Sequence, residues 1–515
     1  MENDDEGAKT IDEVFDERIG QANKAQLTQF ALASIAWFPA AFLTLASVFT
    51  ARVPEWLCAT HGACDGVEFC KLERTSWTWV DPKASIVSEW DLVCEHEYKV
   101  QFADSIFFVG FFFGAGLLGQ LADVKGRVFG LYLSTACASI GALLAACANG
   151  YWMYFICMCL RGFGCGGLGV ASYVLCLEFL GAKWRAVLGI STQYFWSAGI
   201  SLMAGVAYTL PKWRHFCAFA GLFGLSYIAL TCKYLLESPR WYLATGQVEK
   251  AQEVMIYLAK GNTSSTIVKL PPLKQQRVVK GLNVTAVFPF PALRHRLVAM
   301  MYIFCITSLV YYGLSLNVGS LTGSIYMNTF FYGIVEFPAH AFAQIAVDKI
   351  GRKMTQVILL GTAAFGVTLS AFFTGSLQIT VSMIGRFGIA GSFNMIYLYV
   401  TELFPTIVRS ACLGACSLAA RFGGIIAPGI ILARAISPTL PPIFLGAAAA
   451  SACLVTFTLP ETQGLIIEES LAGADRQNMS LRGVAANPRD VGFAPLPEDA
   501  IDDDIPMLSH DRERL

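Results

Sequence analysis

The chain has 515 residues, of which 55% are hydrophobic and only 15% are charged, and its mean hydropathy is +0.53. Soluble domains carry about 25% charged residues, so this composition excludes an ordinary soluble enzyme. The net charge of -1, from 37 basic and 38 acidic residues, excludes the basic excess expected of a nucleic-acid-binding protein. The composition therefore indicates a protein that crosses a membrane several times.

Twelve apolar segments of about 20 residues, the length that crosses the hydrocarbon core of a bilayer, follow one another along the chain. Six lie within residues 27–236 and six within residues 297–460. We expect spans at 27–50, 102–122, 129–148, 152–174, 186–209, 216–236, 297–316, 322–347, 355–374, 378–401, 411–433 and 442–459. The predicted fold class is an all-α membrane protein with twelve transmembrane helices in two six-helix halves.

Lysine and arginine gather in the connections on one side of the predicted bundle, which predicts that both chain ends face the cytoplasm. The remaining segments are then a cytoplasmic N-terminal tail (1–26), an extracytoplasmic loop (51–101), a cytoplasmic linker (237–296) with a helix near 247–260, and a cytoplasmic, disordered tail (461–515).

Four of the 16 cysteines lie in the predicted extracytoplasmic loop, namely Cys58, Cys64, Cys70 and Cys94. Cysteines on the oxidising side of a membrane form disulfides, so we expect two bridges here, with three pairings open. A zinc site is the alternative, although the spacing lacks a CxxC pair. Since no catalytic triad, metal motif or cofactor motif occurs elsewhere, we expect no enzymatic activity, metal or cofactor.

Charged residues recur at an offset of 224 or 225 residues. Asp123 and Arg127 close the connection between the second and third spans, and Asp348 and Arg352 occupy the same place in the second half. The set continues with Arg161 and Arg386, Glu178 and Glu402, Arg185 and Arg409, and Glu237 and Glu461, with Arg240 ending the motif ESPR. This repeat indicates a duplicated six-span unit, as in secondary transporters. We expect the set to act in gating without touching substrate; for any single pair, a fixed salt bridge is the alternative.

The segment GQLADVKGR at 119–127, with its second copy, resembles the signature of the major facilitator superfamily. The stretches FVGFFFGAGLLGQLADVKGR, ESPRWYL, SFNMIYLYVTELFPTIVRS and AARFGGIIAP resemble the organic cation, carnitine and anion transporters of that superfamily, most of all the plant organic cation/carnitine transporters. The resemblance covers residues 25–465 and implies a secondary active transporter that moves carnitine or other organic cations by alternating access, coupled to H⁺ or Na⁺.

Two alternatives remain open. A sugar or organic anion porter of the same superfamily shares the ESPR-like and PETxG-like motifs, but the first span has no acidic residue between Gln29 and Ala51, where proton-coupled sugar porters use a carboxylate. A membrane sensor on the same scaffold that does not transport is the alternative of another class.

Two charged positions inside predicted spans mark a candidate substrate site near the midplane. Arg421, in the eleventh span, stands where the related carnitine and anion carriers have arginine, and it is predicted to clamp a carboxylate, with a structural ion pair as the alternative. Glu336, one turn before His340 in the eighth span, is predicted to attract a cationic head or, with His340, to couple protons. An internal pair with His340 or Arg421 is the alternative for Glu336.

A quaternary ammonium ion cannot donate hydrogen bonds, so aromatic faces are its natural seat. The candidates are Tyr173, Phe195, Trp196, Tyr311, Tyr312, Phe393 and Tyr397. The resemblance supports Tyr173, Tyr312, Phe393 and Tyr397 most clearly. We therefore expect a small organic cation or zwitterion such as carnitine as the substrate, a lipid bilayer but no nucleic acid as a partner, a monomer, and a location in the plasma or vacuolar membrane.

Overall fold

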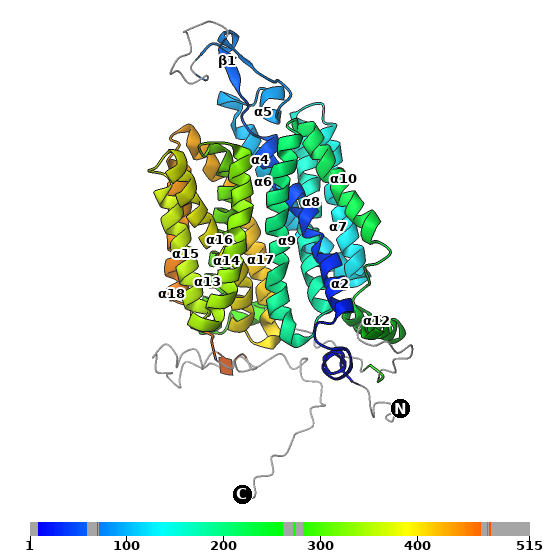
Figure 1. The fold of residues 1–515 in the computed structure, drawn as a ribbon. Helices are drawn as coiled ribbons and strands as arrows, with labels where there is room; N and C mark the ends of the chain where they lie inside the picture. The colour runs from blue at the N-terminus through cyan, green and yellow to red at the C-terminus, as the bar shows by residue number, and fades with distance from the viewer. Residues whose placement is uncertain are drawn as a thin grey trace, which may run out of the picture.

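The computed structural model describes residues 9–58, 70, 72–260, 271–273, 282–464, 471 and 473–474. Long helices run side by side between two ends (Figure 1). One end carries β1 and α5 and is called the loop side here; the other carries α12 and is called the linker side.

The first half contains six spans. The first span consists of three consecutive helices, Lys24–Ser34 (α2), Trp37–Leu45 (α3) and Ser47–Thr50 (α4), and the others are Tyr98–Lys125 (α6), Arg127–Ala146 (α7), Tyr151–Glu178 (α8), Ala182–Thr209 (α9) and Trp213–Thr231 (α10). The break between α2 and α3 has a local cause: Pro39 has no N–H to donate to the carbonyl of Ile35, four residues earlier.

The second half contains Pro291–Asn317 (α13), Ile325–Ile350 (α14), Arg352–Leu369 (α15), Gly375–Leu403 (α16), Thr406–Ile431 (α17) and Leu440–Phe457 (α18). Within the described ranges, nine spans are long and apolar enough to cross a membrane by length and composition. Helices α9, α10 and α15 coincide with the predicted fifth, sixth and ninth spans and complete the twelve. The predicted fold class is confirmed.

Small residues let helix backbones touch within each half. A Cβ atom on Gly162 of α8 would lie 1.9 Å from the carbonyl oxygen of Phe107 on α6. In the second half, a Cβ atom on Gly423 of α17 would lie 2.0 Å from the carbonyl oxygen of Cys305 on α13. In a bilayer, where no hydrophobic effect drives helices together, this close packing is what holds the spans together.

The segment predicted as an N-terminal tail contains structure. Ile11–Val14 (α1) and the following π-helix Phe15–Ile19 (η1) bury four apolar side chains, Ile11, Val14, Phe15 and Ile19, each no more than 4% exposed. Because Thr10 caps α1 through a capping box, the helix begins at a defined residue.

The linker forms short helices at Pro239–Ala244 (α11), Val248–Lys260 (α12) and Val284–Val287 (η5), so the helix predicted near 247–260 is confirmed. The predicted disordered tail lies, from residue 475 onward, outside the described residues.

The long loop has a small fold of its own. Trp56–Cys58 (β1) pairs with Trp77–Trp79 (β2) in antiparallel order, and Ile86–Glu89 (α5) follows, with 3-10 turns at Arg74–Ser76 (η3) and Cys94–His96 (η4). Two further 3-10 turns, Val318–Ser320 (η6) and Leu432–Ala435 (η7), end spans of the second half on the same side.

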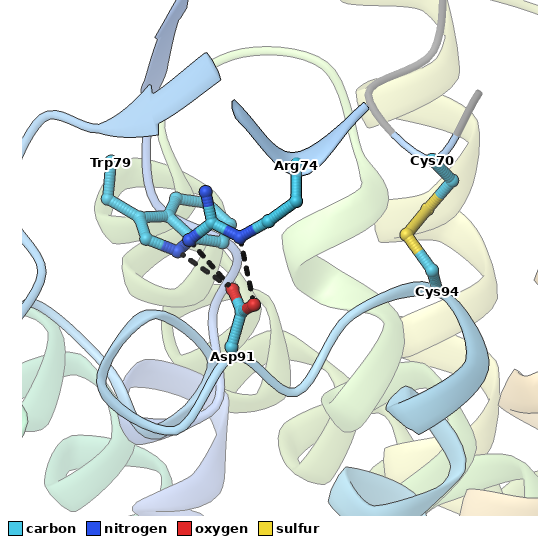
Figure 2. The surroundings of a disulfide bond; sticks show 5 residues. All are labelled: Cys70, Arg74, Trp79, Asp91 and Cys94. Carbon is cyan, nitrogen blue, oxygen red and sulfur yellow. Dashed lines mark hydrogen bonds and ion pairs between the residues drawn. A yellow bond between two sulfur atoms is a disulfide. The ribbon is translucent and has the colours of Figure 1, made fainter. Parts of the chain in front are cut away.

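Figure 2 shows the disulfide between Cys70 and Cys94, with Asp91 nearby accepting from Arg74 and Trp79. This bridge is one of the two expected. Cys58 is also disulfide-bonded, and Cys64 lies outside the described residues.

Candidate functional site

The two glutamates that end the sixth and twelfth spans cap equivalent helices on the linker side. Glu237 accepts hydrogen bonds from the backbone N–H groups of Arg127 (2.9 Å) and Val128 (3.1 Å) at the start of α7. Glu461 accepts from those of Arg352 (2.8 Å) and Lys353 (3.0 Å) at the start of α15. A carboxylate is favourable here because the first N–H groups of a helix are unpaired and carry partial positive charge.

A glycine precedes each capped helix and leaves room for the carboxylate. Gly126 has φ +119° and Gly351 has φ +89°, a region that favours glycine. A Cβ atom there would lie 2.4 Å from a Glu237 carboxylate oxygen and 2.5 Å from one of Glu461, respectively. Burial raises the pKa of Glu237 above its usual value, although backbone N–H groups stabilise its charged form.

The arginines of the repeated motif bind carboxylates across these junctions. Arg127 pairs with Asp123 and also with Glu178, at 3.3 Å from Nε to Oε1. Arg352 forms two hydrogen bonds with Glu402, at 2.8 and 2.9 Å. The Asp–Arg pair of the motif is therefore a direct ion pair in the first half. In the second half, Arg352 pairs with Glu402 in place of Asp348.

Arg185 and Arg409 occupy equivalent places after α8 and α16. Each donates to a backbone carbonyl five residues earlier, Arg185 to Leu180 at 3.1 Å and Arg409 to Phe404 at 3.4 Å. Arg185 also pairs with Asp12 of α1.

Arg240 of the ESPR motif also pairs with the carboxylate of Asp12, at 2.7 Å. Burial alone would raise the pKa of Asp12, but Arg240 and Arg185 lower it below its usual value. The N-terminal segment is therefore joined to the repeated motif of the first half.

The remaining pair of the repeat, Arg161 and Arg386, lies inside helices α8 and α16, where both residues are buried. Arg386 pairs with Glu336 at 2.6 Å, donates to Ser315 Oγ at 2.8 Å, and lies 3.9 Å from the ring centroid of Tyr311. Both arginines are core residues of their spans, and their part in gating stays a prediction. The internal pair of Glu336 is made with Arg386, not with His340 or Arg421.

A hydrogen-bond network around Glu336 joins the two halves. Its carboxylate accepts from Tyr311 Oη at 2.8 Å and from Ser197 Oγ of α9 at 2.7 Å. Ser197 lies 3.2 Å from His340 Nε2, and Asn394 lies 3.3 Å from His340 Nδ1. A charge in the membrane needs such partners. The carboxylate of Glu336 is thus held by Arg386 and by donors from both halves.

The predicted aromatic residues form one connected cluster between the halves. Trp196 donates from Nε1 to Tyr311 Oη at 2.6 Å. Ring centroids are 5.5 Å apart for Tyr311 and Tyr312, 5.4 Å for Tyr311 and Phe393, 6.1 Å for Phe393 and Tyr397, and 6.5 Å for Tyr397 and Tyr173. We call these six residues the aromatic cluster. Phe195 lies apart, against Phe30 and Phe38 of the first span.

Arg421 lies at the contact between α17 and α6, next to this cluster. Its guanidinium carbon is 4.4 Å from the ring centroid of Phe111, and Phe108 of the same helix is 4.6 Å from Tyr312. Among the described residues, Arg421 makes no ion pair, and its buried Nε has no hydrogen-bond partner. The arginine therefore faces the other half of the molecule with hydrogen-bonding capacity left over.

A cavity of about 710 Å³ lies between the halves on the loop side. Its lining comes from both halves and includes Arg52, Asp104, Tyr326 and Arg434. Arg421 and the aromatic cluster are not part of this lining. Within the aromatic cluster, Trp196, Tyr311 and Tyr312 are buried, whereas Tyr173, Phe393 and Tyr397 are partly exposed.

Sequence reasoning missed several of these residues. Ser197 and Asn394 are ordinary polar residues in a span, and only the fold brings them to His340. Asp104 carried a usable signal, since an acidic residue within the predicted second span is costly and therefore informative.

A family model described as "Sugar (and other) transporter" matches residues 83–471. Organic cation/carnitine transporter 4 of Arabidopsis thaliana is 36% identical over 442 residues, which cover 82% of this chain and 83% of that protein. Organic cation/carnitine transporter 3 of the same plant is 30% identical over 92% of this chain and 95% of its own length. A solute carrier family 22 member 15-like protein of Xenopus tropicalis is 33% identical over 84% and 91%, respectively.

Among solved structures, the partially occluded inward-open xylose transporter XylE of E. coli matches 86% of this chain and 99% of its own, with a TM-score of 0.60 and 16% identity. At this identity the likeness shows the fold alone. Fold and motif geometry together define a multi-pass membrane transporter of the major facilitator superfamily. The chain belongs to the sugar (and other) transporter family, and within it to the group of the organic cation/carnitine transporters.

Proposed function

We propose that this transporter moves carnitine or a similar small zwitterion, and organic cations related to it, by alternating access of a site between its two halves. Arg421 binds the carboxylate of the substrate, and the aromatic cluster receives its trimethylammonium group. The observation that carries the proposal is the free hydrogen-bonding capacity of Arg421, which faces α6 of the other half beside aromatic rings.

The chemistry of the two substrate groups fits these residues. A guanidinium forks onto both oxygens of a carboxylate, which a lysine ammonium cannot do. A quaternary ammonium ion is attracted by the negative faces of aromatic rings, and desolvation between helices strengthens that attraction. Arg421 and the aromatic cluster belong to both halves, so a bound substrate contacts both at once.

Glu336 contributes to this site indirectly. Its carboxylate is engaged by Arg386, Tyr311 and Ser197, so we assign it the role of positioning Tyr311 within the aromatic cluster. The attraction of a cationic head and proton coupling through Glu336 and His340 both require this carboxylate to leave its partners.

The contacts at the helix junctions on the linker side are the candidates for a role in alternating access. The capping glutamates and the Arg127 and Arg352 ion pairs tie helix junctions of equivalent geometry, one in each half. Because each set of contacts lies within one half, we infer that it holds the helix junction of that half together while the halves rock. The linker side is assigned to the cytoplasm, on the distribution of lysine and arginine.

Counterflow in proteoliposomes tests the proposal. Purified protein is reconstituted with unlabelled carnitine inside, and uptake of labelled carnitine, choline, tetraethylammonium and glucose is followed. We expect transient accumulation of carnitine, weaker accumulation of the two cations, and none of glucose. Accumulation of glucose alone would assign the protein to the sugar porters, and no accumulation of any compound would favour a sensor.

A further inference from the structure

The two halves contain the same buried arginine with different partners. Arg386 on α16 forms an ion pair with Glu336, and both side chains are only 1% exposed. Arg161, its equivalent on α8, has no hydrogen-bond partner for Nε, Nη1 or Nη2 among the described residues. Its guanidinium carbon lies 5.2 Å from the ring centroid of Phe107. A fully buried guanidinium without partners is costly, so it requires an explanation.

The first half has no acidic residue at the position equivalent to Glu336. The position equivalent to Glu336, 225 residues earlier, is Phe111, which cannot pair with Arg161. The acidic residue of α6 inside the predicted span is Asp104, seven residues or about two helix turns closer to the loop side than Phe111. Its side chain is 7% exposed and experiences the charge of Arg161, but the two form no direct ion pair.

Asp104 lies at the wall of the loop-side cavity of about 710 Å³, beside Ser47 and Gln101. The buried Oε1 atom of Gln101 also has no hydrogen-bond partner among the described residues. A path from the loop-side solution therefore reaches a nearly buried carboxylate whose counter-charge, Arg161, lies deeper in the same half.

The groups that face Asp104 suit a proton better than a metal ion. Burial disfavours the ionised carboxylate, whereas the guanidinium of Arg161 favours it, so the two effects oppose each other. A proton neutralises the carboxylate without further ligands, whereas a sodium ion needs several oxygen atoms and would be repelled by Arg161. Among the described residues, the other charged and titratable groups around Asp104 and its cavity are Tyr151 and Tyr154 of α8, Arg52, Glu55, Asp81, Tyr326 and Arg434.

We propose that Asp104 binds the coupling proton from the loop side and that Arg161 is its counter-charge. With the cavity open, the carboxylate takes up a proton and forms an O–H bond. When the loop-side cavity closes, the O–H bond breaks, the proton leaves on the linker side, and the charge of Arg161, in the same half, stabilises the ionised Asp104. This inference rests on the proposed function, and it assigns proton coupling to Asp104 in place of Glu336 and His340.

The test compares wild type with Asp104→Asn in proteoliposomes under an imposed pH gradient. One coupled proton and a gradient of about one pH unit support about tenfold accumulation of substrate. We expect wild type to accumulate carnitine under the gradient and D104N to reach only equilibration while retaining counterflow, which needs no net proton movement. Glu55→Gln is the matched control, because it removes an exposed carboxylate of the same cavity and should leave the accumulation unchanged.

Several outcomes would overturn the inference while leaving the proposed function in place. These are wild-type counterflow without an effect of the pH gradient, accumulation driven only by sodium, and gradient-driven accumulation by D104N. If D104N loses counterflow as well, Asp104→Glu is decisive. A glutamate can still bind a proton, so this variant should accumulate carnitine, with a shifted midpoint in the pH dependence of accumulation. An unchanged midpoint would contradict the role of Asp104. Absence of wild-type counterflow would instead contradict the proposed function itself.

Discussion

The arginines inside the spans have different partners, and the difference indicates what each residue does. Arg386 is closed by Glu336, whereas Arg421 stands against an aromatic ring with its Nε atom unsatisfied. A charge inside a membrane costs several kcal/mol unless it is paired or faces a polar space. The closed pair therefore has a structural role, whereas Arg421, which faces the other half, is open to a ligand anion.

Substitution of Glu336 tests the structural role of the closed pair. Glu336→Gln leaves Arg386 buried without its counter-charge, and breaking a buried pair in this way costs about 3 to 5 kcal/mol. We expect a clear fall in the thermal unfolding temperature of the detergent-purified protein. The double variant with Arg386→Met should recover much of that loss, because no unpaired charge remains. Unfolding of E336Q at the wild-type temperature would contradict this role.

At the scale of elements, the ends of the helices carry the repeated motif. Sequence alone predicted that Glu237 and Glu461 are equivalent, because they recur at the offset of the other motif residues. It did not predict that each caps the third span of its half, since this contact joins residues 109 and 110 positions apart. The glycine at φ +119° or +89° is required by the carboxylate beside it.

Alanine substitution tests the caps. In Gly126→Ala the new Cβ atom meets the carboxylate of Glu237 and the backbone is strained, at a cost of about 1 to 3 kcal/mol for the strain alone. We expect a lower unfolding temperature and slower counterflow, and the same for Gly351→Ala. Gly116→Ala on α6 is the control, since nothing lies within 4 Å of its Cβ position. Equal behaviour of G126A and G116A would argue against the cap.

The N-terminal helix was missed because its sequence is short and acidic, and because its apolar residues are buried only against the folded linker side. Ile11, Phe15 and Ile19 become core residues once Asp12 meets Arg185 and Arg240. Local sequence contains no sign of partners that lie 173 and 228 residues away.

This docking should depend on pH. The pKa of Asp12 is lowered from 3.8, so its contribution is fully present above that value and disappears as pH falls through the lowered pKa. We expect Asp12→Asn at neutral pH to lose about 1 kcal/mol of docking, given the partial exposure of these ion pairs. Hydrogen exchange of residues 11–19 measures it, and exchange in D12N no faster than in wild type would exclude the contact.

At the scale of the whole molecule, charged and polar side chains join the two halves on the loop side. On the loop side, Arg52 donates to Tyr326 at 2.5 Å and Arg434 pairs with Glu97 at 3.2 Å, each across the halves. The duplicated halves and the twelve spans were predictable from hydropathy and the repeat. The network around Glu336 was not, because it depends on how the halves face each other.

A charge swap tests whether the Glu97–Arg434 pair belongs to the loop-side gate. Glu97→Arg places like charges across the halves and should slow or unbalance transport by a few-fold, in keeping with about 1 kcal/mol for a half-exposed pair. Glu97→Arg with Arg434→Glu restores the attraction and should restore the rate. The cycle of single and double variants in counterflow measures the coupling. Additive effects would show that the pair takes no part in gating.

The clamp at Arg421 is the central claim, and the ratio of carnitine to choline counterflow tests it most directly. Carnitine has the carboxylate that Arg421 is proposed to bind, whereas choline lacks it, and a charge-assisted contact of this kind is worth about 1.5 to 3 kcal/mol. Arg421→Ala should therefore reduce carnitine exchange by about tenfold to a hundredfold and leave choline exchange largely intact, with Arg421→Lys between the two. Equal loss of both substrates in correctly folded protein, or unchanged carnitine exchange, would contradict the account.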